Sequence, residues 1–120
     1  MSVIRVTAHF RVKPGKADQF RHFAATLVEK VRRSERGDTS IYAFYRSSDD
    51  PAMWIAHEAF EDAEAFAKHV QNLTPEFRAA SHLFDLVRSD ICGDLPPPLA
   101  SSLLGQSNVH RLFDSLVDSI

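Results

Sequence analysis

Residues 52–70, AMWIAHEAFEDAEAFAKHV, pass from one hydrophobic periodicity to another. Up to Phe60, apolar side chains fall on both alternating sets of positions, which is typical of a strand buried on both faces. Glu61 and Asp62 end this run, and Asp62 is a suitable N-cap for a helix whose first turn contains Glu64. The expected apolar stripe of that helix is Ala63, Phe66, Ala67 and Val70. The stretch therefore predicts a strand followed directly by a helix that lies back over the sheet.

The preceding segments also alternate between strand and helix. Residues 3–12, VIRVTAHFRV, place apolar and polar side chains at alternate positions, which indicates a strand with one buried face. After the turn signal KPGK, residues 16–35 have the periodicity of an amphipathic helix. Its apolar positions are Phe20, Phe23, Ala24, Leu27, Val28 and Val31. Residues 39–46 and 52–60 are expected to form two strands joined by the hairpin loop 47–51.

Downstream, the sequence TPEF favours a new helix, with Thr74 as its N-cap and Pro75 at its first position. Residues 86–92 read as a fourth strand. The resulting order, βαββαβ, is that of the ferredoxin-like α+β fold with a four-stranded antiparallel sheet, which we expect over residues 1–93. Residues 94–120 are expected to form a Pro-rich linker and a C-terminal helical tail. The apolar positions at helical spacing in the last part of the tail are Val109, Leu112, Phe113, Leu116, Val117 and Ile120.

The composition is that of one small domain with little net charge. The chain has 120 residues, a formal net charge of -2 and a single cysteine, Cys92. It has no strong field to attract nucleic acid or an anionic membrane, and it cannot form an intrachain disulfide or a CxxC site. No apolar run approaches the roughly 20 residues that span a bilayer, and the N-terminus lacks a signal-peptide pattern. We therefore expect a cytoplasmic protein without nucleic-acid or membrane partners.

Two helices can cover only one face of the predicted sheet. Residues 39–46 and 52–60 are nevertheless apolar on both faces, and an exposed apolar sheet of that extent favours a partner. We predict a homodimer in which two sheets pack face to face. The tail is expected to pack on this dimer, with a lid over a pocket and a frayed helix as alternatives.

Several short motifs appear in a recognisable order. They are VKPGK after the first strand, YRSSDDP in the central hairpin, E-x-F-E-D-x-E-A-F-x-x-H from Glu58 to His69, and PEFRAA after it. This set resembles the antibiotic biosynthesis monooxygenase family over roughly residues 3–93, and the tail lies outside the likeness. The resemblance implies a dimeric α+β barrel. It also implies, for some members, oxidation of phenolic or quinol aromatics by O2 without metal, flavin or haem, so no cofactor is expected.

Such an oxygenase needs a dry aromatic cavity, a base that titrates near neutrality and a donor for the developing oxyanion. His69 is the candidate base, and its spacing places it near Phe66 at the rim of the pocket. Glu58 is the second catalytic candidate because it could orient a histidine, whereas an ion pair with Arg5 or Arg11 is its alternative role. The residues expected to line the substrate pocket are Phe10, Phe23, Tyr42, Trp54, Phe66 and Phe77.

The sequence leaves three functions open. They are a cofactor-independent monooxygenase, a non-catalytic binder of small hydrophobic molecules and a proton-transfer isomerase. Haem degradation is disfavoured, because the resemblance aligns Ala8 and His69 with an asparagine and a tryptophan of haem-degrading relatives. No metal site is expected, since no two histidines stand at a ligand spacing such as HxxxH.

Overall fold

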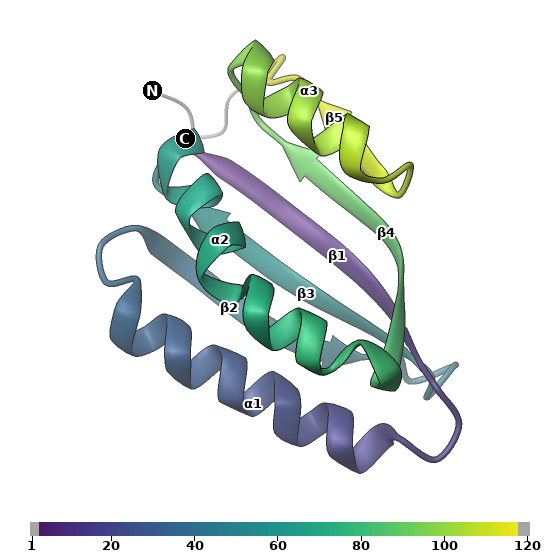
Figure 1. Ribbon diagram of the computed structural model, residues 1–120. Coiled ribbons are helices and arrows are strands. Elements are labelled where there is room, and N and C mark those ends of the chain that lie inside the picture. Colours follow the sequence, from purple (N-terminus) through teal and green to yellow (C-terminus); the bar gives the residue numbers. More distant parts are fainter. Residues whose placement is uncertain (1–2, 118–120) are drawn as a thin grey trace.

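A computed structural model of the chain describes residues 3–117. Its elements are β1 (Ile4–Val12), α1 (Ala17–Ser34), β2 (Thr39–Arg46), β3 (Met53–Phe60), α2 (Ala63–Ala79), a short 3₁₀ helix (Ser81–Leu83), β4 (Phe84–Cys92), α3 (Pro97–Gln106) and β5 (His110–Phe113). The elements up to β4 follow the predicted βαββαβ order (Figure 1). No helix within the described residues is long and apolar enough to cross a membrane.

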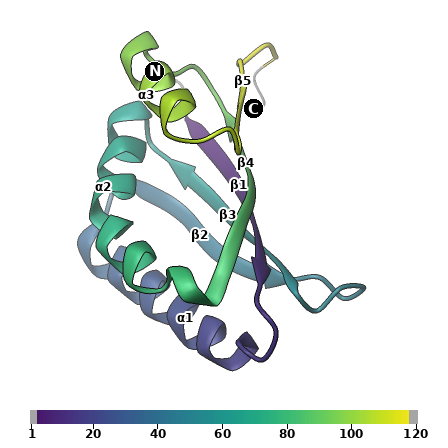
Figure 2. The ribbon, with the colours of Figure 1, turned by 45° about the vertical axis from the view of Figure 1, so that its right-hand side comes forward.

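One sheet organises the molecule, with strand order β2-β3-β1-β4-β5. The pairs among β1, β2, β3 and β4 are antiparallel, whereas β5 runs parallel to β4. Helices α1 and α2 lie on one side of the sheet, and the opposite side carries none of the helices formed by residues 3–117 (Figures 1 and 2). The ferredoxin-like α+β fold is therefore confirmed, but the sheet is mixed and five-stranded rather than purely antiparallel and four-stranded.

The fifth strand stands where a helix was expected. Helical spacing does not produce a helix within residues 109–117, because His110 and its neighbours pair in parallel with β4 from Ser89 onward. Without this pairing, β4 would expose the unpaired backbone groups of an edge strand. Leu116, one of the predicted apolar positions, is 93% exposed, and Ile120 lies outside the described residues.

Residues 94–99, which contain three consecutive prolines, were expected to form a linker. Instead, helix α3 begins within them, at Pro97. Pro97 occupies the first position of α3, where its missing backbone N–H is no loss. Leu103 of α3 is buried, and it belongs to an apolar cluster with Phe60 and Phe66. Leu95, Leu99 and Leu112 pack against the same cluster. The tail thus packs on the end of the sheet where β3 leads into α2.

Helix α2 is continuous, contrary to the prediction of two helices. Asp62 caps its N-terminus as expected, and its carboxylate accepts a hydrogen bond from the Ala65 N–H at 2.9 Å. The Thr74 hydroxyl donates to the Val70 carbonyl at 2.6 Å, so Thr74 lies within the helix and Pro75 does too. The buried side chains of the helix are Ala65, Phe66, His69 and Leu73. Their packing on the sheet and α1 holds the helix together despite the proline.

Candidate active site

His69, predicted off the centre of the apolar stripe of α2 at the rim of a pocket, is one of the buried residues of that helix and lines a cavity. Its side chain is only 5% exposed. Its ring lies against Tyr42 of β2 and Phe60 of β3, with centroid separations of 4.9 and 4.7 Å. Because the imidazole is shielded from water on both sides, its polar partners decide its protonation.

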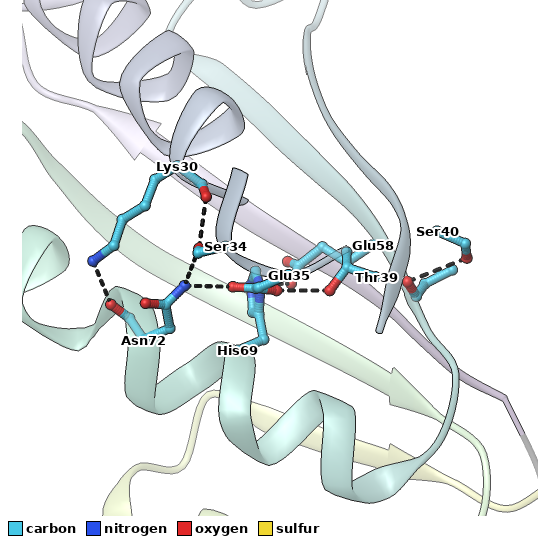
Figure 3. Close-up of polar contacts among 9 residues, drawn as sticks. Lys30, Ser34, Glu35, Thr39, Ser40, Glu58, His69 and Asn72 are labelled. Carbon is cyan, nitrogen blue, oxygen red and sulfur yellow. Dashed lines mark hydrogen bonds and ion pairs between the residues drawn. The ribbon is translucent and has the colours of Figure 1, made fainter. Parts of the chain in front are cut away.

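Two carboxylates contact this imidazole, one at each nitrogen (Figure 3). Nδ1 lies 2.8 Å from Oε1 of Glu35, the residue that follows α1. Nε2 lies 3.2 Å from Oε1 of Glu58, in the middle of β3. The C-cap residue of α1, one residue of α2 and one residue of β3 therefore form one buried chain, Glu35–His69–Glu58.

Glu35 is the fixed end of this chain. Its carboxylate accepts hydrogen bonds from the Thr39 hydroxyl at 2.6 Å and from the Asn72 amide at 2.8 Å, in addition to His69 (Figure 3). Burial alone would raise the pKa of Glu35, but these three hydrogen bonds outweigh it and hold the pKa below its usual value of 4.5. Glu35 is thus ionised at neutral pH and can only accept, so Nδ1 of His69 carries a proton.

Glu58 is the adjustable end. Burial raises its pKa above 4.5, and the hydrogen bond and positive charge of His69 offset this only in part. Burial lowers the pKa of His69, but Glu58 and Glu35 together raise it above 6.5. Since Nδ1 is already protonated, the contact between Nε2 and Glu58 requires one further proton, held by either partner. This shared proton can be exchanged with a bound molecule.

A cavity of about 170 Å³ opens beside Glu58 and His69, between the sheet, α2 and the tail. Its walls are mainly apolar. Four of the six aromatic residues predicted to bind substrate line it, namely Phe10, Tyr42, Phe66 and Phe77. The polar residues in its walls, apart from the Tyr42 phenol, are Glu58, His69, Ser89, Gln106 and His110.

The other two aromatic residues predicted to line the pocket lie elsewhere. Trp54 contacts Phe20 at a centroid separation of 5.2 Å and has the guanidinium of Arg21 over its ring at 5.8 Å. Phe23 contacts Phe20 and other rings of the same aromatic core. Both residues fill the space between α1 and the sheet, and neither is among the residues that line the cavity.

The alternative role considered for Glu58, an ion pair with arginine, is not formed. Arg5 is exposed, and the nearest acidic partner of Arg11 is Asp50 at 3.5 Å. On β1, Val6 stands opposite Glu58, so the flanking arginines turn to the other face of the sheet. The partner of Glu58 is His69.

Several residues of the site had no visible signal in the sequence. Glu35 stands in the charged segment RSERGD, where acidic residues are ordinarily solvated. His110 lies in a segment with helical spacing, which concealed its place in a strand. Asn72 could have been found, because it follows His69 by three positions and so shares its helix face.

The carboxylates do not converge on one point. Glu35 and Glu58 contact different nitrogens of His69, so the imidazole fills the space between them. Within residues 3–117, no group of three or more His, Cys, Asp or Glu side chains is arranged to hold a metal ion.

The fold and the site define a ferredoxin-like α+β domain with an apolar cavity and an acid–base pair in its wall. The chain belongs to the antibiotic biosynthesis monooxygenase family, whose sequence model matches residues 3–83, more than half of its length. No curated protein matches the sequence significantly. The family match ends before β4, α3 and β5, so it does not include the far wall of the cavity.

Solved structures share the fold. MupZ from Pseudomonas fluorescens is 18% identical with a TM-score of 0.80, over 100% of this chain and 95% of MupZ. A conserved protein from Methanosarcina mazei Go1 is 24% identical with a TM-score of 0.65, over 76% of this chain and 89% of that one. Rv0793 from Mycobacterium tuberculosis is 18% identical with a TM-score of 0.66, over 79% of this chain and 97% of that one. At these identities the likeness establishes the fold and not the reaction.

Proposed function

We propose that the protein is a cofactor-independent monooxygenase that oxidises a small phenolic or quinol aromatic in the cavity between its helices and its sheet. The observation that supports this most is the buried chain Glu35–His69–Glu58 at the wall of an apolar cavity. An apolar cavity excludes water, and a proton held between two groups of raised pKa can be exchanged with a phenol.

The reaction requires the protein to move protons, because the substrate itself supplies the electrons. The Glu58–His69 pair accepts the phenolic proton, and the electron-rich anion then reduces O2 and forms a carbon–oxygen bond at the ring. The pair returns this proton to the peroxide, removal of the ring C–H proton then breaks the O–O bond, and the departing hydroxide takes up the ring proton and leaves as water. The products are a quinone and one water molecule, which balance one phenol and one O2.

Tyr42 is the proposed donor to the developing oxyanion. It lines the cavity beside His69. Burial raises its pKa well above 10, and the nearby charges of Glu58 and Glu35 add to this effect. Tyr42 therefore keeps its proton at neutral pH and can donate a hydrogen bond without being ionised itself.

The test is oxygen consumption with a panel of naphthols and hydroquinones. We expect uptake by the wild type, formation of a quinone without hydrogen peroxide, and loss of uptake in His69→Ala. The matched control is His22→Ala, because His22 is exposed on α1 and is not among the residues that line the cavity. Uptake that survives equally in both variants would remove His69 from the mechanism.

A proton-transfer isomerase is the second candidate, because the Glu58–His69 pair can move a proton without O2. Exchange of substrate C–H protons with D2O under nitrogen, lost in His69→Ala, would favour this reaction. Binding of the aromatic probes with neither exchange nor oxygen uptake would instead favour a non-catalytic binding protein.

We also propose that the protein functions as a homodimer through the helix-free face of the sheet. On that face, Ile41 and Tyr45 of β2 are 51% and 54% exposed, and Val87 of β4 is 48% exposed. Light scattering should give the mass of two chains, and Tyr45→Glu should give one. Leu104→Glu is the control, because Leu104 is equally exposed but lies on α3.

A further inference from the structure

Four polar residues of the cavity lie in two separate places. Glu58 and His69 come from β3 and α2, whereas Ser89 and His110 come from the paired strands β4 and β5. The order β3-β1-β4-β5 places three inter-strand steps of about 4.8 Å between Glu58 and His110, so their backbones are separated by roughly 14 Å across the sheet and are also offset along the strands, since Glu58 is level with Leu112. The wall between them is apolar, with Val6, Ala8 and Ile91 from β1 and β4. A molecule that fills the cavity therefore meets polar groups at both ends.

His110 has a buried nitrogen without a partner. Its Nδ1 is inaccessible to solvent and forms no hydrogen bond with any residue from 3 to 117. Buried polar atoms in folded proteins are nearly always paired, and because His110 lines the cavity, a rotation of its ring that turns Nδ1 toward the cavity would give this nitrogen a ligand or water as its partner. Burial lowers the pKa of His110, and the ring is therefore neutral at pH 7, with one donor and one acceptor nitrogen.

The surroundings of His110 favour a neutral ligand group. No arginine or lysine is among the residues that line the cavity within the described chain. The guanidinium of neighbouring Arg111 donates to the carbonyls of Asn108 and His110. A carboxylate or phosphate would thus lack a cationic partner here, whereas a hydroxyl can donate to or accept from a neutral imidazole, whichever tautomer it adopts.

This end of the cavity is formed by residues beyond the family match. The match ends at residue 83, and Ser89, Leu103, Gln106 and His110 all follow it. The acid–base pair lies within the match and the far wall does not. The tail is therefore the part of this chain that can select a substrate for the chemistry of the family.

We propose that His110 binds a hydroxyl at the far end of the substrate, so that the preferred substrates are dihydroxy aromatics with their two oxygens at opposite ends of the ring system. This inference rests on the proposed function, which places the other hydroxyl of the substrate at Glu58 and His69. Ser89, which stands opposite His110 in the β4–β5 pair and lines the same cavity, offers the far hydroxyl a second polar neighbour.

The test is calorimetric binding of 2-naphthol and 2,6-dihydroxynaphthalene under nitrogen. We expect the wild type to bind the dihydroxy compound about tenfold more tightly, as one added hydrogen bond predicts. His110→Leu should abolish this preference, so that the two compounds bind this variant with equal affinity. His110→Asn, which keeps a polar group near the position of Nδ1, should retain part of the preference.

Three outcomes would overturn the proposal: equal binding of both compounds by the wild type, binding of neither compound, or an unchanged preference in His110→Leu. Because binding is measured without O2, the result is independent of the monooxygenase assay. Preference for the dihydroxy compound without oxygen uptake would support the role of His110 and contradict the monooxygenase. Oxygen uptake without a preference for the dihydroxy compound would support the monooxygenase and contradict the role of His110.

Discussion

Nδ1 of His69 lies 2.8 Å from Oε1 of Glu35, although 34 positions separate the two residues in the sequence. This contact joins the end of α1 to the middle of α2 above the sheet (Figure 3). Since Glu35 also accepts from Thr39 and Asn72, it fixes the orientation of the imidazole and directs Nε2 toward Glu58.

Glu35→Gln should destabilise the protein and impair proton transfer together. The substitution removes the charge that balances a buried imidazole and places an amide N–H₂ among the donors of Thr39 and Asn72. We expect the free energy of unfolding to fall by about 3 kcal/mol in urea titrations, with a parallel loss of oxygen uptake. Glu29→Gln is the control on the same helix, because Glu29 is 51% exposed and its ion pairs should contribute less than about 1 kcal/mol. Equal effects of both substitutions would show that Glu35 has no special role.

The Glu58–His69 pair should make stability fall with rising pH. Both pKa values are raised in the folded protein, from 4.5 for Glu58 and 6.5 for His69. Each group therefore stabilises the fold at pH values below its pKa in the unfolded chain. That contribution is lost as the pH rises through the pKa of the group in the folded protein. The free energy of unfolding of the wild type, minus that of Glu58→Gln/His69→Gln, should decrease from pH 5 to pH 9. A difference that increases over this interval would contradict the raised pKa values.

Glu58→Gln should separate activity from stability. Burial disfavours the ionised form of Glu58, so an amide of the same shape should keep or raise the thermal midpoint at pH 8. Oxygen uptake should fall by roughly 100-fold or more, because the variant loses one member of the acid–base pair. Glu61→Gln serves as the control, since Glu61 is exposed just beyond β3 and should change neither quantity. A midpoint lowered by several degrees with activity retained would assign Glu58 a structural role.

The parts of the fold that could be predicted from sequence depend on local rules. Alternation in residues 3–12 predicts β1, and Asp62 caps α2 because its carboxylate reaches an N–H only three positions away. Glu35 could not be predicted in the same way. Its role depends on contacts with His69 and Asn72, which only the packing of α1 on α2 brings within reach.

Two errors of local prediction have the same cause. Pro75 favours a break in α2, yet packing of the buried stripe on the sheet and α1 carries the helix through it. Residues 109–113 fit a helical period, yet the free edge of β4 supplies backbone partners that make them a strand. In both segments tertiary contacts outweigh the local preference.

Leu103→Ala should show that the tail is part of the folded domain and of its cavity. Leu103 is 4% exposed, and it packs against the cluster containing Phe60 and Phe66 while lining the cavity. We expect the free energy of unfolding to fall by about 3 kcal/mol, as for other buried leucines, together with weaker binding of 2-naphthol. Leu104→Ala is the matched control, because its neighbouring side chain is 55% exposed and should change stability by no more than about 0.5 kcal/mol. If the two variants unfolded alike, the tail would not pack on the sheet in solution, because only a packed Leu103 can differ from its exposed neighbour.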